Sequence, residues 1–402
     1  MDAKHLTAYV VFFIIVSNTL IIYALTKDYG LFNDESAHYS QIRDFVRGSS
    51  VLHCLSTLPG YHAVMAFLAT FFADSSRSFV RFLNVVFSIL SVFVFYLCAK
   101  TVHNKSSVEK TIQFWLLPLL FPYFFLIYTD VLSLWFILLM MLLLLKKRFQ
   151  IAALSGIMAC LVRQNNVVWL AFAIVFIWGE EFSFRKDLHS LNCLLQKCLL
   201  FVFGILSIVF YLVVNGHLVP CRPELHPLTF SLGNVYMALF LLCIFYLPIH
   251  VANARKIYSL LQDHKIHLIY LILFCGFFVF PFVSINPQNN NGQDWVLMNY
   301  LLGQLKSSII LRALLCIPIA YVILSLFVIK LMKPVYRLFF IFSFLFLAAS
   351  WFVEPRYYII PFSMFILFRR PKGPVVEYFA IFFSLILSIA LFSLVSFYSI
   401  VL

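Results

Sequence analysis

Charged residues are scarce in this sequence. They make up 11% of its 402 residues, whereas hydrophobic residues make up 63%. A chain with so few charges lacks the polar surface of a soluble globule that folds around one buried core. Internal repeats and low-complexity linkers are also absent, so nothing in the sequence separates domains. The composition therefore predicts a membrane protein with a single transmembrane domain over residues 1–402.

Metal and redox motifs are missing as well. The nine cysteines lie mostly inside apolar runs, with no CxxC pair and no histidine-rich spacing. The sequence therefore predicts no metal site or cofactor. Only Cys54 and Cys221 fall outside the expected spans on the outer side, where a disulfide between them requires an oxidising lumen. The sequence does not place these two residues together, and it leaves the disulfide open.

Long apolar runs dominate what is present. They show no sustained alternation of polar and apolar residues, and they lie at residues 8–26, 79–99, 309–329 and 375–402. Inside lipid, such runs satisfy their backbone hydrogen bonds only as helices. We predict an all-α, polytopic transmembrane bundle of about 11 to 13 helices, without strands. The first run is longer than the core of a signal peptide and precedes no cleavage site, so we count it as a span.

Other apolar segments are short for a membrane span. Further spans are expected near residues 112–127, 131–145, 149–162, 167–178, 198–214 and 231–250. The first four are short, which indicates an outer cavity that reaches into the bilayer, with polar turns on its floor. Residues 62–72 cover only about 17 Å as a helix. We expect them to lie in the interface or to re-enter, as part of a large outer loop over residues 27–77.

The formal net charge of +13 is distributed unevenly along the chain. With the N-terminus in the cytoplasm, the cytoplasmic loops hold 19 basic and 7 acidic residues, and the outer face holds 10 basic and 9 acidic residues. This split follows the positive-inside rule, so the positive charge requires no nucleic-acid partner. The same topology places the glycosylation sequon at Asn104 in the cytoplasm, where we expect it to stay unmodified.

A dense polar stretch follows the first expected span. Residues 33–41 contain Asp34 and Glu35, then His38, then Gln41. One interpretation is structural, with Asn33 or Asp34 as the N-cap of a short helix. The other is functional, because paired carboxylates with a histidine can carry acid–base chemistry at the membrane surface. The remaining polar turns favour the functional interpretation.

Three more polar turns are expected on the outer face. They contain Asp130 in residues 128–130, then Arg163, Gln164 and Asn165 in residues 163–166, then Glu354, Arg356 and Tyr357 in residues 351–361. An arginine at membrane depth is costly unless it meets an anion, and a phosphate fits a guanidinium well. An amide-rich stretch at residues 286–295, with Asp294 and Trp295, suits a hydroxyl-rich ligand or forms a plain flexible loop.

These motifs appear in one order along the chain: residues 34–41, 56–61, 128–130, 163–169 and 354–361. In that order they resemble the family of α-1,2-glucosyltransferases that use dolichyl-phosphate glucose to add the terminal glucose of the N-glycan lipid precursor. The resemblance implies a GT-C type, inverting membrane glycosyltransferase with its active site on the lumenal face. Its partners would be the dolichyl-phosphate sugar donor, a lipid-linked oligosaccharide acceptor and the surrounding membrane lipids. The chain looks shorter than typical members, and residues 286–295 depart from the family's usual Asp-Asn-Arg-His segment.

A polyprenyl phosphate is already a competent leaving group, so the enzyme must mainly deprotonate an acceptor hydroxyl and hold the departing phosphate. We predict Asp34 as the general base, with Glu35 and His38 orienting or binding the acceptor. Arg163 and Arg356 are the predicted phosphate contacts. Gln41, Gln164 and Asn165, together with Asp130, Glu354 and Tyr357, complete the predicted substrate-binding set. The roles of Asp34 and Glu35 could be reversed, and the scheme requires no metal.

Two alternatives stay open at the level of the sequence. A transporter would also be polytopic and basic inside, but transporters usually place polar breaks near the midplane of their helices. Another GT-C enzyme, such as a mannosyltransferase or a bacterial homologue, would share the carboxylate stretch but not the later motifs. The endoplasmic reticulum membrane is expected from the resemblance alone, with a bacterial inner membrane as the alternative.

Overall fold

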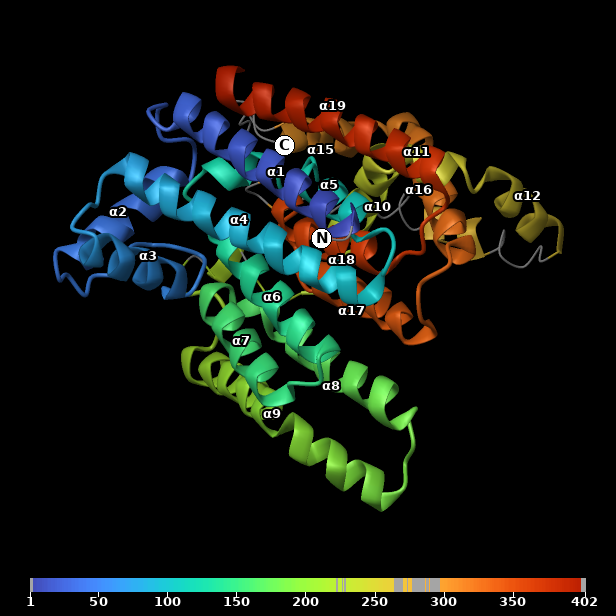
Figure 1. The fold of residues 1–402 in the computed structure, drawn as a ribbon, viewed down its shortest axis with the longest axis horizontal. Helices are drawn as coiled ribbons and strands as arrows, with labels where there is room; N and C mark the ends of the chain where they lie inside the picture. Colours follow the sequence, from blue (N-terminus) through green and yellow to red (C-terminus); the bar gives the residue numbers. More distant parts are fainter. Residues whose placement is uncertain are drawn as a thin grey trace. The chain divides into compact units, whose positions relative to one another are not determined.

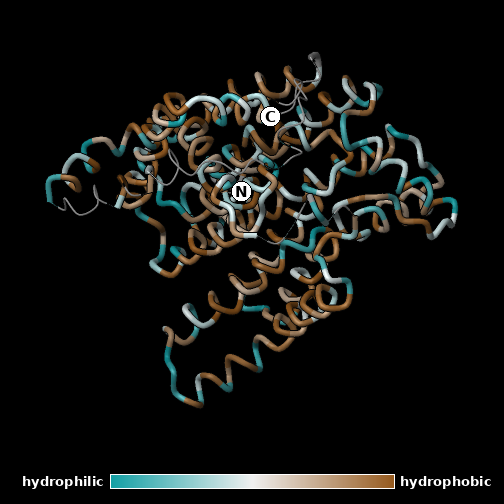
Figure 2. The backbone as a smooth tube through the Cα atoms, turned by 180° about the vertical axis from the view of Figure 1, so that it is seen from behind, coloured by the Kyte–Doolittle hydropathy of each residue, from teal (hydrophilic) through white to brown (hydrophobic). Residues whose placement is uncertain are grey.

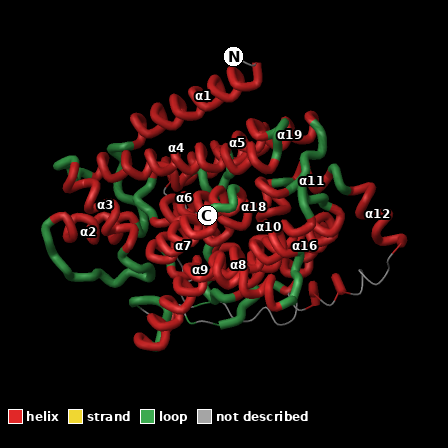
Figure 3. The backbone as a smooth tube through the Cα atoms, turned by 60° about the horizontal axis from the view of Figure 1, so that its bottom comes forward, coloured by secondary structure: helices red, strands yellow, loops and turns green. Residues whose placement is uncertain are grey.

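The computed structural model is almost entirely helical. It describes residues 3–221, 223–225, 227, 229–263, 270–272, 274–276, 286, 289 and 297–398. An isolated antiparallel bridge joins Leu331 and Arg369, and Figure 3 shows the described residues as helices and loops. The predicted all-α, polytopic membrane class is confirmed.

In the described part of the chain, five helices are long and apolar enough to cross a bilayer. Their membrane-spanning segments are Leu6–Thr26, Arg77–Val102, Leu188–Asn215, Ile309–Val328 and Pro374–Ser396. Figure 2 shows hydrophobic residues along most of the helical length, with hydrophilic residues concentrated at turns. In the apolar window of α4 (Arg77–Val102), 56% is buried inside the protein, against 11% in α1 (Ala3–Thr26) and 17% in α19 (Pro374–Tyr398). Helix α4 is therefore an internal scaffold, whereas α1 and α19 present apolar faces suited to lipid.

The chain forms two compact units. The first unit contains residues 1–115, 120–223 and 335–342. Its helices are α1 (Ala3–Thr26), α2 (Glu35–Val46), α3 (Gly60–Phe71), α4 (Arg77–Val102), α5 (Ser107–Trp115), α6 (Thr129–Leu145), α7 (Phe149–Val162), α8 (Val167–Phe182) and α9 (Leu188–Asn215). Helix α6 packs against both α4 and α7, and α9 packs against α7 and α8 (Figure 1). Helices α2 and α3 pack against each other in the segment between α1 and α4.

The second unit contains residues 116–119, 224–334 and 343–402. Its described helices are α10 (Gly233–Phe245), α11 (Leu247–Val251), α12 (Ala254–Asp263), α15 (Leu297–Ser307), α16 (Ile309–Val328), α18 (Ile359–Phe368) and α19 (Pro374–Tyr398). Helix α17 (Leu338–Ala348) begins in the first unit and ends in the second. Helix α16 packs against α10, α12 and α15, and α11 packs against α19.

The sequence placed several helix ends well and one span wrongly. The expected spans at residues 131–145, 149–162 and 167–178 correspond to α6, α7 and α8. The expected span at 112–127 is wrong, because α5 ends at Trp115 and only a 3-10 turn, η1 (Pro122–Phe125), follows before α6. Pro118 and Pro122 account for the break, since each removes a backbone donor and disfavours helix in the residue before it. The expected span at 231–250 is divided into α10 and α11 ahead of Pro248.

Candidate active site

The stretch 33–41 forms the start of α2. Asp34 occupies the N-cap position, without a capping hydrogen bond from its side chain. Asn33 has a φ of 47°, in the left-handed region that asparagine tolerates better than most residues. Asp34 is half-buried, whereas Glu35 is completely buried. The two neighbouring carboxylates therefore have different surroundings, and they are chemically distinct groups.

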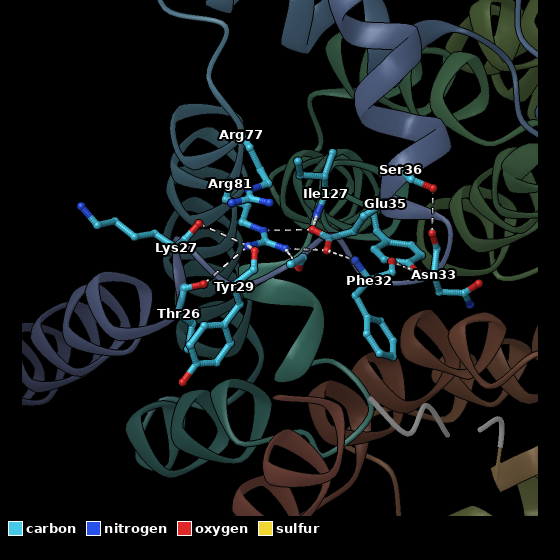
Figure 4. Close-up of polar contacts among 12 residues, drawn as sticks. Thr26, Lys27, Tyr29, Phe32, Asn33, Glu35, Ser36, Arg77, Arg81 and Ile127 are labelled. Atoms are coloured by element: carbon cyan, nitrogen blue, oxygen red, sulfur yellow. Dashed lines mark hydrogen bonds and ion pairs between the residues drawn. The ribbon is translucent and has the colours of Figure 1, made fainter. Parts of the chain in front are cut away.

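Glu35 is paired with Arg81 of α4 (Figure 4). Glu35 Oε2 accepts hydrogen bonds from Arg81 Nη2 at 2.6 Å and from the Phe32 amide at 2.8 Å. Glu35 Oε1 accepts from Arg81 Nε at 3.1 Å and from the Ile127 amide at 2.7 Å. Both side chains are almost inaccessible to solvent. Four N–H donors therefore satisfy a carboxylate that would otherwise be costly to bury.

Arg81 also fixes the loop that follows α1. Its guanidinium donates to the backbone carbonyls of Lys27 at 3.2 Å, Tyr29 at 2.8 Å and Gly30 at 2.9 Å (Figure 4). The Glu35–Arg81 pair thus joins the first loop, α4 and the turn before α6. Sequence reasoning missed Arg81, although a charged residue within an apolar membrane helix is itself a signal of a specific partner.

Two histidines, one from α2 and one from α3, are in contact. His38 Nδ1 is 2.9 Å from His62 Nε2 of α3, and the two rings stack with centroids 5.1 Å apart. Tyr61 and Tyr128 each pack edge-to-face against the His38 ring, with ring centroids 6.1 and 5.5 Å from it. Helix α3 lies outside the candidate spans. Burial lowers the pKa of His62, and the neighbouring His38 and His53 lower it further, which favours the neutral ring.

Two glutamines hold the loop between α2 and α3. Gln41 Nε2 donates to the Val51 carbonyl at 3.0 Å, and its Oε1 accepts from the His53 amide at 2.6 Å. Gln164 Nε2 donates to the Ser56 carbonyl at 2.8 Å, and its Oε1 accepts from the Leu58 amide at 3.3 Å. Both side chains are buried. Each amide therefore recognises backbone at two points, which positions the loop.

A disulfide ties the same loop to the end of the first unit. It joins Cys54 and Cys221, which are 167 residues apart in the sequence, with their Cα atoms 5.2 Å apart. The sequence left this pairing open, because no local pattern reports which distant cysteines meet. Two glutamines and one disulfide thus constrain residues 51–58, which lead into α3.

Asp130 and Arg163 form an ion pair between neighbouring helix ends. Asp130 lies in the first turn of α6, and Arg163 follows the last residue of α7. Arg163 Nη1 donates to Asp130 Oδ1, and the two side chains are 12% and 3% exposed. The next turn is fixed by Asn166, whose Nδ2 donates to Ser133 Oγ and to the Ala159 carbonyl, both at 2.8 Å. Asn165, between these residues, is half-buried.

Four of the predicted motifs therefore converge in the first unit. Glu35, at the start of α2, accepts a hydrogen bond from the Ile127 amide, and Gln164 donates to the Ser56 carbonyl. Gly60, at the start of α3, lies so close to the Leu161 carbonyl that a Cβ would be 2.4 Å from its oxygen. Several buried polar atoms in or next to these motifs have no hydrogen-bond partner among the described residues, namely Thr57 Oγ1, Tyr61 OH, His62 Nδ1 and Asp130 Oδ2. Such groups are costly unless a ligand or water satisfies them.

The fifth motif lies in the second unit. Glu354, Arg356 and Tyr357 form or flank the 3-10 turn η5 (Pro355–Tyr358). Arg356 forms a bidentate ion pair with Glu354, with Nε 2.9 Å from Oε1 and Nη2 3.0 Å from Oε2. The two side chains are 14% and 13% exposed. The Tyr357 ring packs edge-on against Phe346, with centroids 6.4 Å apart.

Two asparagines hold this motif: Asn234, which no sequence motif pointed to, and Asn289 of the amide-rich stretch at residues 286–295. Asn234 Nδ2 donates to the Ser350 and Phe352 carbonyls at 3.0 and 2.8 Å. Asn234 Oδ1 accepts from the Glu354 amide at 3.1 Å and from the Tyr358 hydroxyl at 3.0 Å.

Asn289 pairs with both backbone groups of Val353 at 3.0 Å. A buried asparagine in an expected span is the signal that points to such a role for Asn234. Asp294 and Trp295 of the amide-rich stretch lie outside the described residues. Within the described part of the chain, no group of three or more His, Cys, Asp or Glu side chains could hold a metal ion.

The long helices and the polar groups at their ends define an all-α, polytopic membrane protein with a converging polar site. Residues 29–187 match the DIE2/ALG10 family, and this range holds four of the five predicted motifs. No solved structure matches the chain.

Relatives of known name support the same resemblance. A protein from Candida albicans is 28% identical over 307 residues, covering 69% of this chain and 66% of the relative. One from Arabidopsis thaliana is 33% identical over 127 residues, covering 31% and 25%. A human protein is 24% identical over 305 residues, covering 62% and 64%.

All three are named Dol-P-Glc:Glc(2)Man(9)GlcNAc(2)-PP-Dol alpha-1,2-glucosyltransferase. The predicted resemblance to the dolichyl-phosphate-glucose-dependent α-1,2-glucosyltransferase family is thereby confirmed. The matched region spans no more than two thirds of each relative's length.

Proposed function

We propose that the protein is an inverting membrane glycosyltransferase of the GT-C type. It moves a glucosyl residue from dolichyl-phosphate glucose to a lipid-linked oligosaccharide and forms the terminal α-1,2 linkage. The endoplasmic reticulum membrane is the proposed location, with the active site on the lumenal face. The convergence of four polar motifs in the first unit, all within the region that matches the family, supports this proposal most directly.

Asp34 is the proposed general base. Asp34 is half-buried at the start of α2, and α2 packs against α3, where the Tyr61 hydroxyl and His62 Nδ1 are buried without a hydrogen-bond partner among the described residues. The carboxylate accepts the proton of the acceptor hydroxyl, whose oxygen then forms the new bond to the sugar's anomeric carbon. The bond from that carbon to the phosphate oxygen breaks, and the polyprenyl phosphate leaves with the electron pair.

Glu35 has a different proposed role. Its two oxygens already accept four hydrogen bonds, so a proton taken from substrate would have to displace Arg81 or a backbone amide. We assign Glu35 to holding Asp34 in place through the backbone of α2. We therefore propose the same roles as the sequence suggested, with Asp34 as the base and Glu35 as an orienting group. In this proposal Glu35 does not contact the acceptor.

The arginines are the proposed phosphate contacts. The carboxylate of Glu354 binds the Arg356 guanidinium at two points. An ion pair of this kind keeps the side chain in one orientation before the donor binds, which reduces the entropy cost of binding. Arg163 is held by Asp130 in the same way.

The decisive experiment is transfer with purified protein. We would supply dolichyl-phosphate glucose or dolichyl-phosphate mannose with a lipid-linked oligosaccharide that lacks only the terminal glucose, and analyse the released glycan by mass spectrometry. The proposal predicts one added hexose with the glucose donor, in a linkage that an α-1,2-specific glucosidase removes. Transfer from the mannose donor alone would instead identify a mannosyltransferase.

A matched pair of variants ties the activity to the site. Asp34→Asn should lose transfer, whereas Asp44→Asn, which removes a partly exposed carboxylate from the same helix, should keep it. Loss of transfer in both variants would mean that α2 tolerates no neutralised carboxylate, and the assignment of Asp34 would fail.

A further inference from the structure

A cluster of lysines gathers at one end of two membrane spans in the second unit. Lys330 lies two residues beyond the span in α16, and Lys372 lies two residues before the span in α19. Lys256, in the first turn of α12, is the third member of what we call the basic cluster. Lys256 and Lys330 are exposed, and Lys372 is half-buried.

Backbone pairing brings the two span ends together. Leu331 and Arg369 form the isolated bridge, with the Met332 amide 3.0 Å from the Phe368 carbonyl. The Arg370 amide donates to the Lys330 carbonyl at 2.8 Å. Lys330 and residues 369–372 are therefore held side by side by the fold, and their proximity does not depend on flexible loops.

Buried side chains hold Lys372 in this position. Its Nζ donates to Oδ1 of Asn253, which is completely buried and donates to Ser325 Oγ at 2.8 Å. The Lys372 amide donates to Glu377 Oε1 at 3.0 Å. A lysine two residues before a span could extend its side chain into water. The ammonium group of Lys372 is instead held in place by Asn253.

The charges around Lys372 do not balance. Glu377 is engaged with Arg369 through two bonds of 2.6 and 2.7 Å. Among the described residues, no carboxylate forms an ion pair with Lys256, Lys330 or Lys372. Burial lowers the pKa of Lys372, the neighbouring Lys256, Arg369 and Lys330 lower it further, and Glu377 opposes them as the smallest of these effects. One carboxylate that already pairs with Arg369 does not balance three lysines, so a ligand that supplies negative charge would stabilise the cluster.

The position of the cluster identifies the kind of anion. Helix α12 is amphipathic in its side-chain placement: Ile257 packs against Leu324 of α16, while Lys256 and Tyr258 are exposed. A short helix with an apolar inner face, basic residues and an exposed tyrosine suits the bilayer interface. Phosphates of lipid headgroups are the abundant anions at that depth.

We propose that Lys256, Lys330 and Lys372 form a binding site for the phosphate of an anionic bilayer phospholipid. The site lies at the predicted cytoplasmic ends of α16 and α19, and α18 lies between Arg356 and Lys372 in the chain. The lysines supply point charges and N–H donors to the phosphate, and the apolar sides of the two spans accommodate the acyl chains. The proposal does not depend on the glucosyltransferase activity.

The test compares lipid binding by two sets of variants. The purified protein is placed in phosphatidylcholine nanodiscs with and without phosphatidic acid, and bound lipid is quantified by native mass spectrometry. Each basic residue near an anionic surface contributes roughly five-fold in affinity, so the Lys256→Gln/Lys330→Gln/Lys372→Gln variant should bind phosphatidic acid about 100-fold more weakly.

The matched control removes equal charge elsewhere. It is the Lys105→Gln/Arg185→Gln/Lys186→Gln variant, whose three exposed residues lie in predicted cytoplasmic loops of the first unit. It should retain binding. Replacing the three cluster lysines with arginine should also retain it, which separates loss of charge from loss of folding. Thermal unfolding of each variant in lipid-free detergent checks that the fold survives.

Three results would overturn the proposal. The first is undiminished phosphatidic acid binding by the lysine-to-glutamine variant, and the second is equal loss in the control variant. The third is complete displacement of the lipid by millimolar inorganic phosphate, because a true headgroup site also holds its ligand through the acyl chains.

Discussion

Replacing Glu35 with glutamine gives the sharpest test of how the site is built. Four N–H donors face the two carboxylate oxygens, and each oxygen receives one donor from Arg81 and one from a backbone amide. A glutamine has one carbonyl oxygen and one NH2 group. In either orientation of the amide, the NH2 group opposes one Arg81 donor and one backbone donor.

The cost follows from burial and charge. Both partners of the ion pair are almost inaccessible, so Glu35→Gln leaves the Arg81 charge buried without its counter-ion. Breaking a buried ion pair in this way costs about 3–5 kcal/mol. With an unfolding entropy of about 2.1 cal/mol/K per residue, this loss should lower the apparent Tm of a 402-residue chain by roughly 4–6 °C. Fluorescence-detected thermal unfolding of the purified protein in one detergent, at one scan rate, measures this shift.

A double-variant cycle separates the pair from general damage. Arg81→Met alone leaves the carboxylate unpaired, whereas Glu35→Gln with Arg81→Met removes both charges. If the pair is the main interaction, the double variant should lose less stability than the sum of the two single variants. The reasoning would be refuted if Glu35→Gln kept the wild-type Tm and lost turnover. In that case Glu35, not Asp34, would be the base.

Further predictions concern other residues of the site and the topology. Asp34→Asn should lower turnover by roughly 10² to 10⁴ with donor binding kept, measured by steady-state transfer kinetics, and near-normal turnover would exclude Asp34 as the base. Arg356→Lys keeps the charge but loses the two-point grip, so the KM for donor should rise while folding survives, and an unchanged KM would remove Arg356 from the donor site. Cys54→Ser should lower the free energy of unfolding by about 2–5 kcal/mol when measured without reductant, and an unchanged thermal unfolding curve would argue against a structural disulfide. Asn104 should carry no glycan in a eukaryotic host, and a mass spectrum with glycan at Asn104 would overturn the topology from α4 onward.

The sequence predicted the class of fold because the relevant signal is local. Apolar runs in lipid must be helical, so α1, α4, α16 and α19 could be expected from composition alone. The break after α5 was missed because hydropathy continues through residues 116–127, while Pro118 and Pro122 interrupt the helix.

Partners in the site were harder to predict because they are distant in sequence. Glu35 and Arg81 are 46 residues apart, and Asn234 is more than 100 residues from the backbone groups that it holds. The sequence showed which turns are polar. It could not show that Glu35, Gln41 and Gln164 direct their side chains to protein groups, since that depends on tertiary packing.

The placement of the polar residues bears on the choice between an enzyme and a transporter. A transporter needs groups that bind substrate within broken helices near the middle of the membrane. In the described part of the chain, Asp130 lies in the first turn of α6, Arg163 follows the last turn of α7, and Arg356 precedes α18. Charged pairs at helix ends are suited to a substrate whose reacting group lies at the membrane surface. A lipid-linked sugar has its phosphate at that depth and its acyl or prenyl chain below, so this arrangement favours a transferase that works at the boundary between water and lipid.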